Sequence, residues 1–105
     1  MMEKYETQIS LRAQKDMREI AAYITHELQQ SESALNVVNS LAEVIASLEK
    51  MPERFALVAD TRLARRGIRK LKVGSYLVFF IIDKQSQIVH ILGVLYERRD
   101  WQHIL

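Results

Sequence analysis

Polar and apolar residues alternate at the start of the chain and then change to a helical spacing. Residues 5–11 alternate, with every second side chain apolar or β-branched, which is the period of a half-buried strand. Apolar residues then recur at every third or fourth position, as on one face of an amphipathic helix. They are Ala13, Met17, Ile20, Ile24 and Leu28. We expect Ser10 to cap this helix and the helix to end near Gln29 and Gln30.

A second helical pattern follows after a short polar break. Its apolar stripe consists of Leu35, Val38, Leu41, Ile45 and Leu48. Ser31 or Ser33 can cap its start, and Pro52 closes its end. Two helices joined by so short a link form an antiparallel hairpin, and each has one apolar face to lay on a sheet. Phe55, in the break that follows, is expected to anchor that break in the core.

The last third of the chain has the composition of strands. Residues 57–67 form a basic loop in which we expect a helical turn around 61–65, and residues 68–73 lead to a Gly-Ser turn. Residues 76–82 are aromatic or aliphatic throughout, as in a central strand buried on both faces. After a polar hairpin loop, residues 88–96 form the next strand, in which Gly93 marks a bulge or a close backbone approach. Asp100 is expected to cap a short terminal turn.

The predicted order is therefore β-α-α-β-β-β, and the fold class is α+β. Consecutive strands with short loops pair as a meander, so we expect an antiparallel sheet with the helix hairpin on one face. The other face is open or covered by something else, and we expect function there. Residues 1–105 fit one domain, because domains most often hold about 100–150 residues.

Composition limits the chemistry. The chain has no cysteine, which excludes disulfides and thiolate metal sites, and its three histidines lack the close spacing of metal ligands. We expect neither a metal nor another cofactor. The N-terminus lacks the apolar run of a signal peptide, and the longest apolar run is far shorter than the roughly 18 residues of a membrane span. These features predict a soluble cytoplasmic protein with no membrane partner.

Charge is distributed unevenly between the two parts of the chain. Residues 1–60 carry six Lys or Arg and ten Asp or Glu, whereas residues 61–105 carry nine and three. No acidic residue occurs from Thr61 to Ile82, where six basic residues stand: Arg62, Arg65, Arg66, Arg69, Lys70 and Lys72. A solvated basic loop would explain them, but we favour an anionic partner, either nucleic acid or an acidic polypeptide.

The order of elements and several local segments resemble the RelE/ParE superfamily, the toxins of type II toxin–antitoxin (plasmid stabilisation) systems. The segments are the helix over 17–24, Leu48 with Pro52–Phe55, the stretch from Arg69 to Phe80, and Ile91–Trp101. The resemblance covers nearly the whole chain. It implies a growth-inhibiting toxin that an acidic antitoxin silences in a hetero-oligomeric complex.

The resemblance leaves two activities open. Members similar to RelE cut messenger RNA on the ribosome with basic residues and a C-terminal Tyr or His, whereas members similar to ParE share the fold, act on DNA gyrase and lack that set. By position, Lys70 matches a catalytic lysine, with Arg69 or Ile68 near the place of a second, and His103 matches the terminal residue. Leu77 and Glu97, however, stand where two arginines are expected.

Each candidate residue also has a structural alternative. RNA cleavage needs a base, an acid and cations for the phosphorane charge. His103 has a suitable intrinsic pKa for acid–base work, and its structural alternative is a frayed surface histidine near the C-terminus. Lys70 and Lys72 share one strand face and could contact phosphates or protect a strand edge, while Arg69 points the other way.

The remaining candidates are aromatic or follow the last strand. Arg98 and Arg99 could clamp a phosphate, or one of them could pair with Asp100. Tyr96 could stack on a base, although a core position is favoured, and Trp101 should pack the terminal turn onto the body.

Three interpretations follow. The first is a metal-independent, ribosome-dependent messenger RNA endoribonuclease that uses His103 and Lys70, with Arg69, Lys72, Tyr96, Arg98 and Arg99 in RNA or target binding. The second is a non-enzymatic inhibitor of DNA gyrase. The third is a decayed toxin that only binds its antitoxin.

Overall fold

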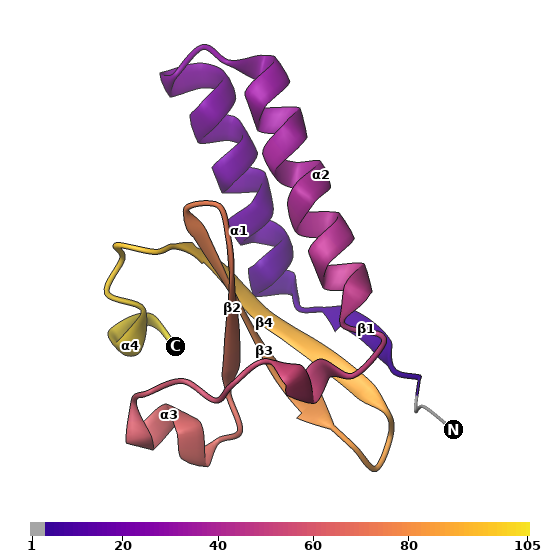
Figure 1. Cartoon of the computed structure of the whole chain (residues 1–105). Helices are drawn as coiled ribbons and strands as arrows, with labels where there is room; N and C mark the ends of the chain where they lie inside the picture. The colour runs from indigo at the N-terminus through magenta and orange to yellow at the C-terminus, as the bar shows by residue number, and fades with distance from the viewer. Residues whose placement is uncertain (1–3) are drawn as a thin grey trace.

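A four-stranded sheet and a protruding pair of helices make up the computed structural model, which describes residues 4–105 (Figure 1). The first half contains strand β1 (Glu6–Ile9), helix α1 (Leu11–Ala22) with its π-helical extension η1 (Tyr23–Glu27), helix α2 (Ser31–Ser47) and the 3₁₀ turn η2 (Pro52–Arg54). The second half contains the short helix α3 (Thr61–Arg65), strands β2 (Arg69–Val73), β3 (Tyr76–Asp83) and β4 (Ile88–Tyr96), and the terminal helix α4 (Trp101–Ile104). The predicted order of strands and long helices is confirmed. None of the helices in residues 4–105 has the length and apolarity that a bilayer crossing requires.

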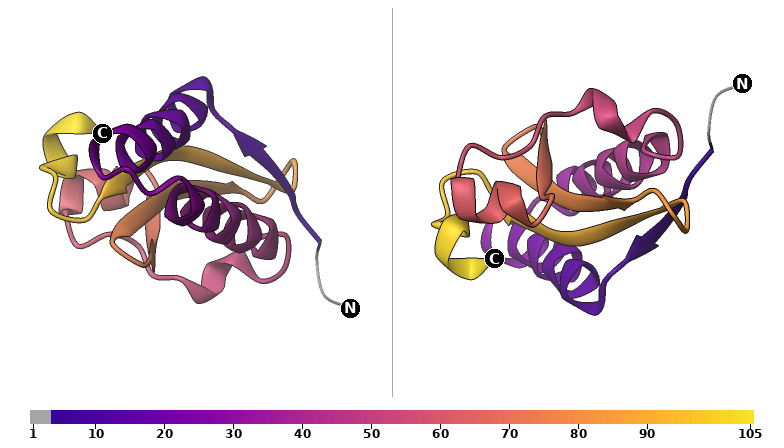
Figure 2. Two further views of the ribbon diagram at one scale, coloured as in Figure 1. Left: turned by 90° about the horizontal axis from the view of Figure 1, so that it is seen from above. Right: turned by 90° about the horizontal axis from the view of Figure 1, so that it is seen from below.

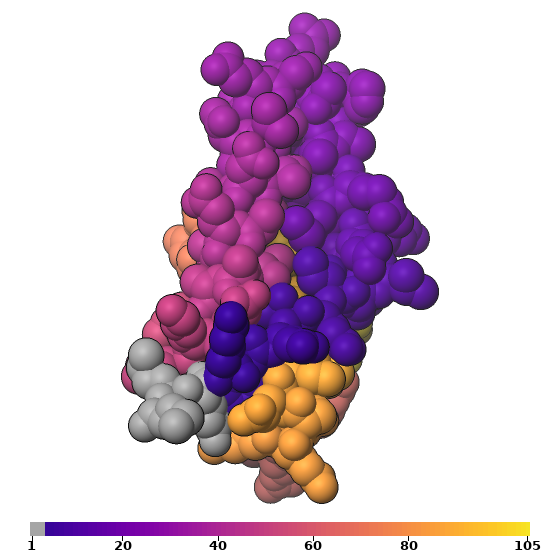
Figure 3. Space-filling view, turned by 90° about the vertical axis from the view of Figure 1, so that its right-hand side faces the viewer, coloured from indigo at the N-terminus to yellow at the C-terminus, as the bar shows by residue number. Residues whose placement is uncertain are grey.

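The helix hairpin forms much as its apolar spacing predicts. Ser10 caps α1, since its Oγ accepts a hydrogen bond of 3.0 Å from the Ala13 backbone N–H. The chain reverses at Gln29, whose φ of 54° lies in the left-handed region. The predicted serine cap of α2 is wrong, because the capping residue is Gln30 and its side chain makes no capping bond. The two helices lie side by side over the sheet, and the β3–β4 turn emerges beneath β1 (Figure 3).

The sheet is mixed, so the expectation of a purely antiparallel sheet is wrong. Its strand order is β1-β4-β3-β2. β2, β3 and β4 form the predicted antiparallel meander, but β1 pairs in parallel with β4, with Glu6 opposite Ile88 and Ile9 opposite Ile91. The helix hairpin lies between β1 and the meander in sequence, and a connection of that length permits parallel pairing.

Gly93 lies at a close backbone approach beside an irregularity of the β3–β4 ladder. It faces Phe79, and the register shifts between Phe79 and Phe80. A Cβ at Gly93 would stand 3.2 Å from Oδ2 of Asp16 on α1. The same Asp16 oxygen accepts a hydrogen bond of 3.0 Å from the buried Val94 N–H, although Asp16 is only 8% exposed. A buried carboxylate thus fastens α1 to β4 where the glycine leaves room.

Each face of the sheet carries its own hydrophobic cluster. The cluster on the helix side includes Tyr5, Leu41, Val78, Phe80 and Ile91, with Phe55 packed against it as predicted. The cluster on the other side consists of Val58, Leu63, Ile68, Leu77, Phe79, Leu95 and Trp101. The face opposite the helix hairpin is therefore covered in part by α3 and α4, which lie together at the end of the molecule away from the N-terminus (Figure 2). β3 is buried on both faces, which confirms its prediction as the central strand.

Candidate functional site

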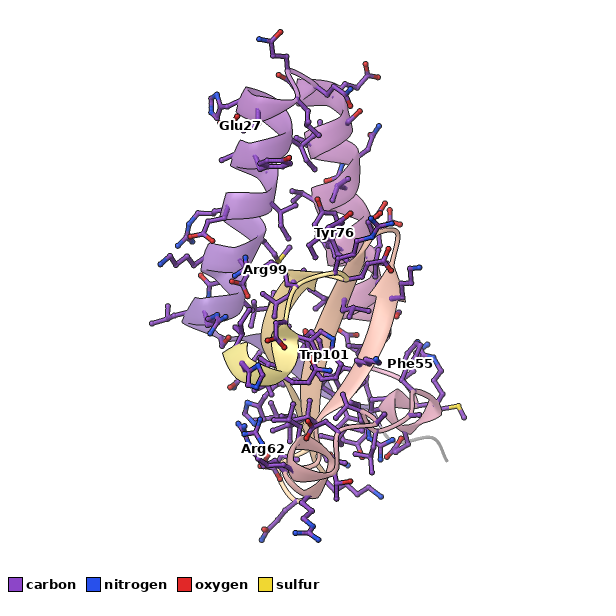
Figure 4. The ribbon with its side chains drawn as sticks, turned by 90° about the vertical axis from the view of Figure 1, so that its left-hand side faces the viewer. Glu27, Phe55, Arg62, Tyr76, Arg99 and Trp101 are labelled. Carbon is purple, nitrogen blue, oxygen red and sulfur yellow. The ribbon has the colours of Figure 1, made fainter. Side chains whose placement is uncertain are left out.

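The C-terminal turn α4 is held against the sheet by apolar packing and by two arginines. The Trp101 ring lies 5.1 Å from the Phe79 ring, centroid to centroid, and Trp101 is buried as predicted. From α3 and the residue after it, Arg62 donates to the Gln102 carbonyl at 2.7 Å and Arg66 to the Leu105 main-chain oxygen at 3.0 Å. Figure 4 shows Arg62 and Trp101 on this side of the sheet. Two arginines of the acid-free basic segment therefore bind the main chain of the C-terminal residues.

The two lysines of β2 project to this face, as the strand period predicts, and both have partners there. The Lys70 Nζ lies 4.8 Å from the centroid of the Trp101 ring, within the range of a cation–π contact. The Lys72 Nζ lies 2.9 Å from Oε2 of Glu97, which stands just after β4. Glu97 stands where the resemblance implies an arginine, so one expected cation is missing. Its carboxylate also neutralises the charge of Lys72. The face has less free positive charge than its sequence indicates.

Two further positions of the expected nuclease set contribute no cation to this face. Arg69 points to the opposite side, where its Nη1 donates to the Phe55 carbonyl at 2.6 Å. Leu77 is only 7% exposed and belongs to the hydrophobic cluster on the sheet face opposite the helix hairpin. Arg69 therefore holds the η2 segment on the sheet, and Leu77 fills the core.

His103 pairs with a carboxylate at the molecular surface. Its Nδ1 lies 2.5 Å from Oδ2 of Asp100, and both side chains are largely exposed. Asp100 precedes α4 but makes no side-chain capping bond, so its predicted capping role is wrong. No ion pair joins Asp100 to Arg98 or Arg99 among the described residues, because its partner is His103. Both arginines are exposed.

A groove of about 770 Å³ lies between the helix hairpin and the end of the sheet where β2 turns into β3. Its walls combine residues of α1 and η1 with the ends of β3 and β4. Among its lining residues are Glu19, Tyr23, Leu28, Tyr76, Tyr96 and Arg99. Tyr23, Leu28 and Tyr96 are 55%, 48% and 42% exposed, so apolar surface remains open to solvent here. Tyr96 is thus a groove residue and not the core aromatic that we favoured.

The tyrosines of the groove interact with one another. The Tyr76 and Tyr96 rings meet edge to face with centroids 6.0 Å apart. Burial raises the pKa of Tyr76 above its ordinary value of 10.0, and the nearby Tyr96 and Tyr23 raise it further. Tyr76 and Arg99 lie at this end of the sheet, below the helix hairpin (Figure 4). The groove therefore offers two aromatic rings in edge-to-face contact, a cation at Arg99 and carboxylates at Asp16 and Glu19.

The strand period assigned Lys70 and Lys72 to one face and Arg69 to the other, as in the structure, but it did not indicate this groove. Part of the signal was in the sequence, because Leu28 carries the apolar stripe of the first helix to its far end and Tyr23 stands beside that stripe. Of the predicted site residues, Tyr96 and Arg99 line the groove. Lys70 and Lys72 lie on the sheet face that α4 covers, which is opposite the helix hairpin. Arg69 lies at neither place.

Several solved structures share this fold. A protein of the chromosomal ParDE toxin–antitoxin system of Pseudomonas aeruginosa superposes with a TM-score of 0.73 at 17% identity, covering 90% of this chain and 97% of that one. A mutant of the Escherichia coli toxin RelE in the free state gives 0.66 at 15% identity, with 96% and 92% covered. A chain of the RelBE2 toxin–antitoxin complex of Mycobacterium tuberculosis gives 0.64 at 18% identity, with 89% and 98% covered.

Sequence comparison identifies the family. No curated protein sequence matches the chain significantly. The family model described as the ParE toxin of the type II toxin–antitoxin system parDE, however, matches residues 8–101, from β1 to the start of α4. Because this match covers most of the chain and agrees with the fold, the chain belongs to the ParE toxin family within the RelE/ParE superfamily of type II toxin–antitoxin systems.

Proposed function

We propose that this toxin arrests growth by binding a protein target, DNA gyrase, and that it does not cleave RNA. The observation that carries the proposal is the engagement, within the chain, of the expected catalytic lysine Lys70 and of Lys72, an expected binding residue. Lys72 is neutralised by Glu97 at 2.9 Å, and Lys70 lies over Trp101. Cleavage of a phosphodiester needs cations directed at the developing charge of the phosphorane, and such preorganised charge usually contributes more to catalysis than any other single effect.

The match to the ParE family supports the same proposal. ParE-like members are the ones that act on gyrase in the superfamily that the sequence resembles, and the match extends over residues 8–101. The buried Leu77 agrees with it, since no cation stands at that position.

One observation favours the nuclease as a second candidate. The Asp100 carboxylate at 2.5 Å from Nδ1 can orient the His103 ring and leave Nε2 to exchange a proton, as a carboxylate does for a catalytic histidine. The pair is exposed, so ribosomal RNA or messenger RNA could reach it.

Induction of the protein in a bacterial host distinguishes the candidates. We expect growth arrest with an induced DNA-damage response, intact transcript ends, and unchanged toxicity in His103→Ala. Inhibition of gyrase supercoiling by the purified protein would support the proposal directly. Messenger RNA cuts in phase with the codons that disappear in His103→Ala would contradict the gyrase proposal. Loss of a general acid or base lowers the cleavage rate about 10²–10⁴-fold, so the cuts of a nuclease should vanish in this variant. Normal growth with abundant folded protein would indicate a decayed toxin.

We further propose that an antitoxin silences the toxin by laying an amphipathic helix in the groove. The structures of related toxins include toxin–antitoxin complexes. An apolar cleft beside a helix pair suits the helix-in-groove mode, and an acidic segment that folds as it docks would find the cation Arg99 among the lining residues. The expectation that function lies on an open sheet face is revised accordingly, because α3 and α4 cover part of that face.

Co-purification with the product of the neighbouring gene checks this docking. Tyr23→Ser combined with Leu28→Ser should weaken the complex, because both side chains line the groove. Leu35→Ser on α2 is the matched control, since Leu35 is 60% exposed and does not line the groove. Equal weakening by the control, or no effect of the double variant, would contradict the groove as the docking site.

A further inference from the structure

Strand β3 continues past the start of its neighbour β2 and leaves a short sheet edge unpaired. The ladder between the two strands begins with Arg69 opposite Phe80, whereas β3 extends to Asp83. We propose that this edge, at residues 81–83, takes up an extended acidic segment of a partner protein as an added strand.

The edge has free hydrogen-bonding capacity. Residues 81–83 pair with β4 on one side, and among residues 4–105 nothing pairs with them on the other. Alternate residues of an antiparallel strand turn their N–H and C=O groups toward each neighbour, so part of this stretch presents its backbone to solvent. Unpaired edge groups of this kind are templates for an added strand.

Beside this edge lies an open hollow of about 500 Å³. The chain turns away from the β2 line at Gly67, whose φ of 81° lies in the left-handed region, and this turn leaves the space free. The hollow is lined by Leu57, Gly67, Arg69, Ile81, Ile82, Asp83, Lys84 and His90. An added strand there would lie beside β3 in line with β2, where β2 would continue if its pairing extended beyond Arg69.

Charge in the hollow selects an acidic occupant. Arg69 and Lys84 are cationic. Asp83 is the carboxylate among the lining residues, and it already accepts a hydrogen bond of 3.2 Å from the Ser86 backbone N–H. Hydrogen bonds from Ser86 also lower the pKa of Asp83, and the nearby His90 adds to this effect. The cations therefore outnumber the acid, whose charge is satisfied within the hairpin.

The apolar residues of the hollow fix the pattern of the occupant. Ile81 and Ile82 lie on opposite faces of β3, because side chains alternate along a strand. Ile81 pairs with His90 on the face that carries Phe79, while Ile82 shares the other face with Phe80 and Arg69. An added strand that alternates apolar and acidic residues would place the apolar ones on the face of Ile81 and the acidic ones on the face of Arg69, where the antiparallel bridge between Leu57 and Arg69 also puts Leu57.

This edge is separate from the groove. The groove contains Tyr76, the first residue of β3, and the hollow contains Asp83, the last. At about 3.3 Å per residue, these ends stand roughly 23 Å apart. The inference therefore does not depend on the proposed function, and both sites could be occupied together.

A blocked five-residue peptide of alternating valine and glutamate is a suitable probe. Titrated into the isotope-labelled full chain, it should shift the backbone amide signals of residues 81–83 and those of Arg69 and Lys84. A peptide with lysine in place of glutamate tests the charge preference. A peptide N-methylated at alternate residues tests the strand pairing, because it lacks the N–H donors, and both should bind more weakly.

Charge reversal in the protein completes the test. Lys84→Glu should lower the affinity for the valine–glutamate peptide roughly threefold, the size expected for an exposed ion pair. Lys15→Glu on the exposed face of α1 is the control and should leave the affinity unchanged. The proposal is overturned if no amide shifts appear at several millimolar peptide, if the shifts fall at the groove, or if the N-methylated peptide binds equally well.

Discussion

Replacing Asp16 by alanine should destabilise the fold, because the Asp16 carboxylate fastens α1 to the sheet. The carboxylate accepts a hydrogen bond from the buried Val94 N–H, so the substitution would leave that donor without a partner. A hydrogen bond to a charged group contributes about 1.5–3 kcal/mol. The ion pair with Arg12 at 3.5 Å adds little, because Arg12 is half exposed. Alanine recovers roughly 0.5 kcal/mol of helix propensity. We therefore expect a net loss of about 1.5 kcal/mol.

Urea unfolding followed by far-UV circular dichroism measures this loss. The midpoint should fall with an unchanged m-value, and Tm should drop by about 6–12 °C. Asp16→Asn keeps an oxygen that can accept from Val94 and should lose less. Glu19→Ala, one turn further along α1, removes only an exposed pair with Lys15 and should stay within about 0.5 kcal/mol of the wild type. Asp16→Ala as stable as Glu19→Ala would refute the reasoning.

Three other substitutions probe the core and the groove. Trp101→Ala should cost about 3 kcal/mol in thermal or urea unfolding, because it removes the buried contact with Phe79. Gly93→Ala should cost about 1 kcal/mol in the same assay, since its Cβ would press on the Asp16 carboxylate at 3.2 Å. Because burial raises the pKa of Tyr76 above 10.0, the folded state favours the neutral phenol, and the free energy of unfolding should fall as pH rises from 10.0 through that raised pKa. Tyr76→Phe should lessen this fall, which unfolding curves at alkaline pH would show.

Local sequence patterns determined most of the elements. The strand predicted over 88–96 coincides with β4, and the helical turn around 61–65 coincides with α3. Ser10 caps α1 because its side chain competes for a local N–H, which is a property of a few neighbouring residues. The prediction that Gly93 marks a bulge or a close approach is confirmed, although the group that approaches it comes from a distant helix.

The incorrect predictions concern partners that are distant in sequence. Alternation indicates that residues 5–11 are extended but carries no information on strand direction, so the parallel pairing of β1 with β4 could not be inferred. The partners of Lys70 and Lys72 lie about 25–31 residues away, beyond any periodic signal. Asp100 does not cap α4, because its carboxylate binds the His103 side chain, one turn later, instead of a backbone N–H.

The length of the helix hairpin has a consequence for local stability. Its outer part, including η1 and the turn at Gln29, is largely exposed, whereas the inner turns of α1 and α2 carry the buried residues of the helix-side cluster. Amide hydrogens near the tip should therefore exchange through small openings that leave the sheet intact, while the amides of β3 and β4 that are hydrogen-bonded within the sheet should exchange only on global unfolding. A partner that fills the groove would slow exchange in η1 selectively. Hydrogen exchange at the hairpin tip can thus report whether the groove is occupied.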